Sequence, residues 1–165
     1  MSCVPARQPS LILINFKYDL EIISEIIQQW KVEKIQLNPP ATLDAIKRTE
    51  ETVNYTFPQD FKELYLIADG FKNWDWRPNM FSLWLLQRII DEYLEELSRN
   101  TDNLTQQDEH AKNFVGFCDY LINSHQIGFF KNSTGVYKSY DEFNPIAQSF
   151  NEALQLINKD ADLIY

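Results

Sequence analysis

Hydrophobic residues recur three and four positions apart in five stretches of the chain, which is the spacing of one face of a helix. Thr42 is a suitable N-cap for the second stretch, and Pro58 suits the first turn of the third. Gly70 follows the third stretch, where a left-handed residue often ends a helix. The predicted helices are 19–33, 42–54, 58–69, 85–98 and a last one from about Ile146, after a break at Asn144-Pro145.

Two of these helices have a well-defined apolar face. In the first, Asp19 is expected near the start, and in the fourth the polar residues lie opposite the inner face. The residues expected to point inward are Ile22, Ile23, Ile26, Ile27 and Trp30 in the first, and Leu86, Ile89, Ile90, Tyr93, Leu94 and Leu97 in the fourth.

The rest of the pattern consists of short runs. Residues 11–16 are apolar, and a run of that length fits a strand or a helix equally well. The β-prone runs are 80–83, 114–118, 127–130 and 136–137, with a four-residue hairpin loop expected at 132–135. Helices first, strands next and one helix last predict an α+β fold, a single domain with an antiparallel twisted sheet packed against helices.

Composition narrows the possible partners. The chain has 165 residues and a net charge of −9, so it repels nucleic-acid phosphates and is better matched to a basic protein. It has two cysteines, too few for a disulfide framework, and no apolar run long enough to span a membrane, which predicts a cytoplasmic protein.

Motifs for catalysis, metal or cofactor binding are not found in the sequence. The four glycines are scattered, so no phosphate-binding loop is present. The spacing of His110, Cys118 and His125 fits no common zinc site, and Cys118 closes an apolar run, as an inert buried cysteine does. We therefore expect no enzyme activity, no metal and no cofactor.

Two features are typical of protein interfaces instead. Trp74, Asp75 and Trp76 lie in a predicted loop at 71–79, and aromatic residues beside a charge often anchor an interface. The segment 91–109 carries seven acids and one base, which accounts for −6 of the net charge. This segment could steer a basic partner, although both features also fit a core lid and a solvated face. The acids on the predicted helix are Asp91, Glu92, Glu95 and Glu96.

Several of these signals resemble, in their order, the SUKH superfamily, which includes the Smi/Knr-type proteins. The chain has a Pro-led helix start at 38–46, a helix glutamate at Glu50 and a segment Phe57-Pro-Gln-Asp-Phe-Lys-Glu-Leu-Tyr65 that ends in Asp69-Gly70. Trp74, the strand after it and the late Ser149-Phe150-Asn151-Glu152 helix also match, so the resemblance covers roughly residues 19–158.

The resemblance implies an α+β domain without catalytic activity. Bacterial members of the superfamily are immunity proteins that bind and neutralise a cognate toxin domain, often a nuclease, and eukaryotic relatives are regulatory scaffolds. The leading hypothesis is therefore an immunity protein that occludes a basic toxin domain, and the alternative is a regulatory or scaffold module. On this interpretation residues 1–18 are an N-terminal extension, 19–165 form the domain, and Asp69 lies beside the Trp74–Trp76 loop as part of the binding surface.

Overall fold

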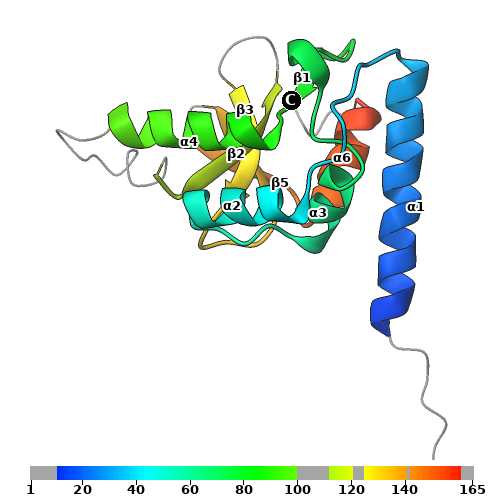
Figure 1. The fold of residues 1–165 in the computed structure, drawn as a ribbon, viewed down its shortest axis with the longest axis horizontal. Coiled ribbons are helices and arrows are strands. Elements are labelled where there is room, and N and C mark those ends of the chain that lie inside the picture. The colour runs from blue at the N-terminus through cyan, green and yellow to red at the C-terminus, as the bar shows by residue number, and fades with distance from the viewer. Residues whose placement is uncertain (1–10, 100–111, 121–124, 141, 161–165) are drawn as a thin grey trace, which may run out of the picture.

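The fold is known from a computed structural model, which describes residues 11–99, 112–120, 125–140 and 142–160. Helices α1, α2 and α3 come first, followed by a short 3-10 turn, η1, and a first strand. Helix α4 then precedes four more strands, and α6 comes last (Figure 1). The elements are α1 (Leu11–Val32), α2 (Leu43–Val53), α3 (Gln59–Tyr65), η1 (Lys72–Trp74), β1 (Phe81–Leu83), α4 (Leu86–Arg99), β2 (Phe114–Tyr120), β3 (His125–Phe130), β4 (Val136–Tyr140), β5 (Glu142–Ala147) and α6 (Phe150–Asn158).

The five strands form one antiparallel sheet in sequence order, β1 to β5. Helix α4 packs against β2 and against α2, while α1 packs against α6 and α3. In Figure 1 α2 and α4 lie in front of the sheet, and α1 stands on the opposite side of the molecule from the far end of α4. The predicted α+β class is confirmed.

The core between helices and sheet is dominated by aromatic rings. Phe61 of α3 is fully buried, and its ring stacks on Phe57 and on Tyr65 with centroid distances of 4.2 Å each. Across the interface the Phe61 ring meets Phe129 of β3 at 5.7 Å and Phe150 of α6 at 5.0 Å. The apolar positions of three elements that are distant in sequence thus hold the layers together.

The first helix begins earlier than its pattern predicts. We expected it to start near Asp19, whereas α1 starts at Leu11 and takes in the ambiguous run 11–16. No glycine or proline lies between Leu11 and Val32, so nothing in the backbone interrupts a helix there. The helix is continuous across the expected boundary at residue 18, and its first turns extend past the other described elements (Figure 1).

The end of the chain also differs from the expectation. The last helix was expected from about Ile146, but Glu142–Ala147 form strand β5, and α6 starts at Phe150 after an N-cap at Ser149. Pro145 was interpreted as a break. It fits because β5 is an edge strand, where a residue without an N–H removes no necessary ladder bond.

Helix α3 is shorter than predicted, since it ends at Tyr65 rather than near Asp69. Gly70 has a φ of 68°, but it does not end this helix. A Cβ atom at Gly70 would lie 2.4 Å from the backbone oxygen of Trp84. Glycine is therefore required at this position because the chain passes directly against the end of β1.

Candidate protein-binding surface

Asp69 caps a helix that is distant in sequence. Its Oδ1 atom accepts a hydrogen bond of 2.8 Å from the backbone N–H of Leu86, the first residue of α4. Burial raises the pKa of Asp69, and the bond from Leu86 partly offsets this rise. Beside it, the Tyr65 hydroxyl donates to the Trp84 carbonyl at 2.6 Å. Asp69 thus satisfies one of the N–H groups that every helix start leaves without a partner.

Asp75 fixes the conformation of the aromatic loop. Its Oδ2 accepts from the backbone N–H of Gln36 at 3.0 Å, and its Oδ1 accepts from the N–H of Trp76 at 2.9 Å. Trp76 is 37% exposed, so part of the indole is available to a partner. The side chain of Trp74, also predicted at the interface, lies outside the described part of the structure.

The next residue, Arg77, anchors this loop to the first helix. The guanidinium is buried, with Nε 2.7 Å from Glu33 Oε2 and Nη2 2.6 Å from Glu33 Oε1. The hydrogen bonds from Arg77 lower the pKa of Glu33, against the effect of burial. Such a bidentate pair holds both position and orientation. Neither Glu33 nor Arg77 is among the site residues predicted from the sequence.

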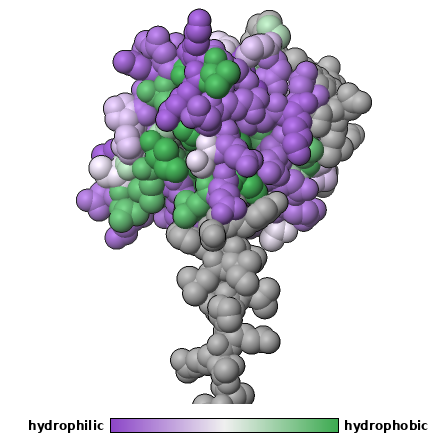
Figure 2. All heavy atoms as spheres, turned by 90° about the vertical axis from the view of Figure 1, so that its right-hand side faces the viewer, coloured by the Kyte–Doolittle hydropathy of each residue, from purple (hydrophilic) through white to green (hydrophobic). Residues whose placement is uncertain are grey.

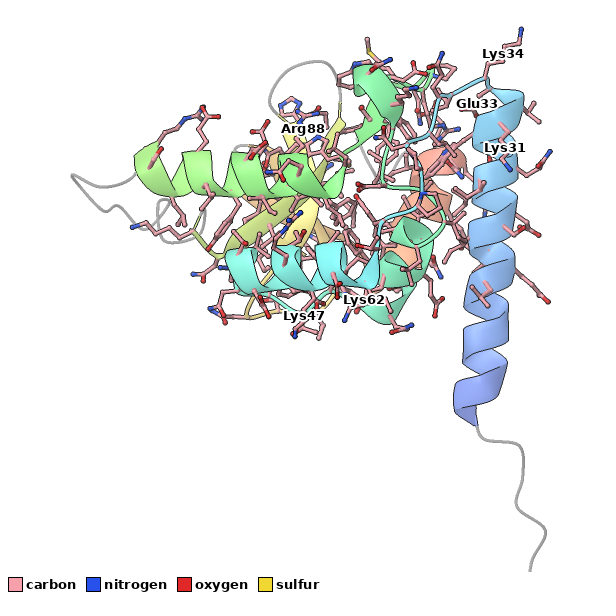
Figure 3. The ribbon with its side chains drawn as sticks, viewed as in Figure 1. Lys31, Glu33, Lys34, Lys47, Lys62 and Arg88 are labelled. Atoms are coloured by element: carbon pink, nitrogen blue, oxygen red, sulfur yellow. The ribbon has the colours of Figure 1, made fainter. Side chains whose placement is uncertain are left out.

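The charged side chains around the aromatic loop include exposed lysines as well as acids. Figure 3 shows Lys31, Glu33 and Lys34 together around the C-terminal end of α1. The exposed Lys72 lies in the loop just before Trp74, and its backbone N–H donates to the Gln36 carbonyl at 2.7 Å. Glu33 and Asp75 are engaged in internal bonds, whereas Lys31, Lys34 and Lys72 are exposed. Figure 2, which looks onto the α1 side, shows mainly hydrophilic side chains with separate hydrophobic patches.

The acidic residues of α4 form a second surface, away from the loop. The helix begins at the Asp69 cap and runs toward the far side of the molecule (Figure 1). Asp91 and Glu95 are exposed, whereas Glu92 and Glu96 are half-buried. The structure therefore separates the predicted site residues into two groups that do not share one face. We call the exposed residues of α4 the α4 outer stripe; they are Gln87, Asp91, Leu94, Glu95, Ser98 and Arg99.

Leu94 belongs to this stripe, and its predicted inward orientation is wrong. Its side chain is 47% exposed. On a helical wheel Leu94 lies about 100° from Tyr93, at the margin of the apolar face. It points in nearly the same direction as Gln87, two turns earlier. The angle of Leu94 on a helical wheel indicates this marginal position, whereas the recurrence of apolar residues along the helix does not. The stripe thus combines an exposed leucine with carboxylates on both sides.

Two arginines determine how the acids of α4 are paired. Arg88 bonds Glu92 at 3.3 Å and Asp119 of β2 at 2.7 Å, and it lies 4.3 Å from the centre of the Trp84 ring. Arg99 pairs with Glu95 and, at 3.7 Å, with Glu96. Asp91 accepts a hydrogen bond of 2.9 Å from the neutral Gln87 side chain.

Glu50 and Asp60, two acids that contribute to the family resemblance, also make hydrogen bonds within the fold. Glu50 Oε1 accepts from the N–H of Phe57 at 2.8 Å and pairs with Lys62 at 2.8 Å. Asp60 accepts from the N–H of Phe61 at 3.0 Å and from the N–H of Asn151, in the first turn of α6, at 2.9 Å. These bonds fix the turn before α3 and the start of α6.

Cys118, the cysteine considered as a candidate nucleophile, is fully buried. Burial raises the pKa of the Cys118 thiol well above its ordinary value, so the reactive thiolate is disfavoured. Within the described ranges, no three His, Cys, Asp or Glu side chains are grouped so that they could hold a metal ion. His110 lies outside those ranges. None of the described helices is both long enough and apolar enough to cross a bilayer.

Comparison with known proteins assigns the family. The model of the SMI1 / KNR4 family (SUKH-1) matches residues 40–156, which is most of the chain. The protein therefore belongs to the SMI1/KNR4 family, and the resemblance drawn from the sequence is confirmed. The matched range contains Glu50, Asp60, Asp69 and all of α4. A comparison with curated proteins gave no match.

Proposed function

We propose that this protein is an immunity-type protein that binds a basic toxin domain and occludes its active surface. It acts by binding and not by catalysis, in the cytoplasm where a delivered toxin would otherwise work. Membership of the SMI1/KNR4 family supports the class, because this family is associated with immunity-like proteins. The net charge of −9 supports the basic character of the partner.

The observation that carries the proposal is the α4 outer stripe. Asp91 and Glu95 are exposed on one face of a helix whose opposite side is packed on the sheet and α2, so their positions are fixed by the fold. Leu94 lies between them and is 47% exposed. An apolar anchor with acidic neighbours suits a basic partner, because the charges speed the encounter and the leucine is desolvated on contact.

Co-expression tests this function most directly. The gene should protect cells from the toxin domain encoded beside it, and the purified pair should associate more slowly as ionic strength rises from about 0.05 to about 0.2 M, because the screening length falls over that range. Binding without protection would favour the regulatory or scaffold alternative. An association rate that does not change with ionic strength would refute electrostatic steering.

Two matched double variants separate the stripe from net charge. Asp91→Lys with Glu95→Lys reverses the stripe, and Glu25→Lys with Glu51→Lys makes the same change of net charge at exposed positions of α1 and α2. The first is expected to slow association by about tenfold or more, as rim charges do in steered complexes. The second is expected to have a much smaller effect. If both double variants slowed association equally, the net charge of the whole molecule would control the rate, and not the charges on α4.

A further inference from the structure

A cavity of about 250 Å³ opens between the start of α3, the start of α6 and the turn that joins β3 to β4. It is smaller than the roughly 300–1,000 Å³ of sites for drug-sized ligands, so it suits one side chain better than a whole small molecule. None of the lining residues is Lys, Arg or His, and one carries a carboxylate. The lining residues are Tyr55, Pro58, Asp60, Phe129, Ser133, Thr134, Gly135, Val136, Gln148, Ser149 and Phe150.

The cavity has aromatic walls. The rings of Tyr55 and Phe129 stack with their centroids 5.5 Å apart and their planes at 24°. Phe150 is fully buried behind them, packed against Phe129 at 6.3 Å. Flat ring faces attract a cationic head group and also pack against the methylenes that carry it.

The electrostatics of the cavity are negative. Asp60 is 9% exposed, and its carboxylate stays in place through its bonds to Phe61 and to Asn151. A second carboxylate, of Glu152, accepts from the backbone N–H of the rim residue Gln148 at 2.7 Å. The charge of Asp60 acts on the cavity wall: burial and this charge together raise the pKa of Tyr55 to about 12. Among the lining residues, a cation entering the cavity would meet one acid, Asp60, and no competing base.

The rim adds neutral oxygen atoms. Ser133 and Thr134 lie on the β3–β4 turn and are exposed, and Gln148 and Ser149 precede α6 on the other side. Hydroxyl and amide oxygens at several positions suit a planar donor with several N–H groups better than a compact ammonium.

We propose that this cavity binds an arginine side chain presented by a protein partner, with the guanidinium near Asp60 and the rim oxygens and the stem against Tyr55 and Phe129. The site lies on different elements from the α4 outer stripe. It extends the proposed function, because the arginine would belong to the bound protein, but it can be tested with small probes and without any toxin.

The test uses N-acetyl-arginine amide, the lysine equivalent and the neutral citrulline equivalent in NMR titrations. The arginine probe should shift the backbone amide signals of Ser133, Gly135 and Ser149, the lysine probe should do so more weakly, and citrulline should leave them unchanged at the same concentrations. Equal responses to arginine and citrulline would overturn the proposal, since the charge would then contribute nothing.

Variants at the rim sharpen the result. Ser133→Trp fills the opening and should abolish the arginine response, whereas Asn132→Trp, on the same exposed turn but outside the lining, should preserve it. Gln148→Glu should tighten and Gln148→Lys should weaken binding of the arginine probe, each by about two- to fivefold, the size of an exposed charge pair. If Ser133→Trp does not fold, the Gln148 pair decides: unchanged affinity in both variants would refute the site.

Discussion

Two groups of carboxylates in this protein have opposite roles. Glu33, Asp60 and Asp69 turn inward and bond to Arg77, to the start of α6 and to the start of α4. Asp91 and Glu95 point outward from α4 and bond only to side chains of their own helix among the described residues. The comparison shows that the role of a carboxylate can be assigned only once the group that hydrogen-bonds to it within the fold is known. The inward carboxylates hold the helices in place, and one of these helices, α4, carries the outward carboxylates.

The largest expected loss of stability comes from breaking the buried ion pair between Glu33 and Arg77. Glu33→Ala leaves the guanidinium of Arg77, which is 5% exposed, without its carboxylate, and should lower the free energy of unfolding by about 3 kcal/mol. Urea denaturation measures the change. The matched variant Glu95→Ala removes the partner of the exposed Arg99 and should cost less than about 0.5 kcal/mol. Similar losses in the two variants would contradict the division into two groups.

The same pair predicts a response to acid. The pKa of Glu33 is lowered from its ordinary 4.5 by the hydrogen bonds from Arg77, so the folded state binds this proton less readily than the unfolded state. The stabilisation is present above pH 4.5 and is lost as the pH falls through the lowered pKa. Glu33→Gln should therefore show a smaller loss of stability on acidification than the unaltered protein, in denaturation series at several pH values.

The second effect concerns the cap of α6. Asp60→Ala removes the acceptor of two backbone N–H groups and should destabilise the fold by about 2 kcal/mol, because one of these groups starts a helix and both are buried. Thermal unfolding gives the value. Asp91→Ala, the outward control, should remain within about 0.5 kcal/mol of the unaltered protein.

A smaller effect separates charge from hydrogen bonding at Asp69. Asp69→Ala loses the cap of α4 and should cost about 1 kcal/mol, while Asp69→Asn keeps an oxygen for the N–H of Leu86 and should cost little. Because burial raises the pKa of Asp69 above 3.8, ionisation opposes folding, and stability falls as the pH rises from 3.8 through the raised value. Asp69→Asn should gain stability relative to the unaltered protein over that rise; a parallel pH profile would contradict the assignment.

The smallest expected effect on stability is at Leu94, in the proposed binding surface. Leu94→Ala should change the free energy of unfolding by less than about 0.5 kcal/mol, since the side chain is 47% exposed. The same change should lower affinity for the partner by about fivefold or more, mainly through faster dissociation, if Leu94 is desolvated in the complex. If the free energy of unfolding fell by as much as the binding free energy, Leu94 would have a packing role instead.

The sequence by itself determined the class of fold, the family and most of the core. Apolar periodicity is a local property, so it predicted α2 and α4 nearly to their ends, and the short β-prone runs marked β1 to β4. Local rules failed where the neighbours are distant: Pro145 is tolerated because β5 is an edge strand, and Gly70 is needed because Trp84 passes beside it.

Only the tertiary structure decided which acids are available to a partner. Asp69, Asp75, Asp91 and Glu95 look alike in the sequence, since each is a carboxylate in a polar context. Their difference lies in backbone N–H groups supplied by Leu86 and Gln36, 17 and 39 residues away. A hydrogen bond needs its donor within about 3 Å, and which donor is that close depends on how the chain packs. The cavity at the starts of α3 and α6 has the same origin, because its walls come from four segments that meet only when the helices cover the sheet.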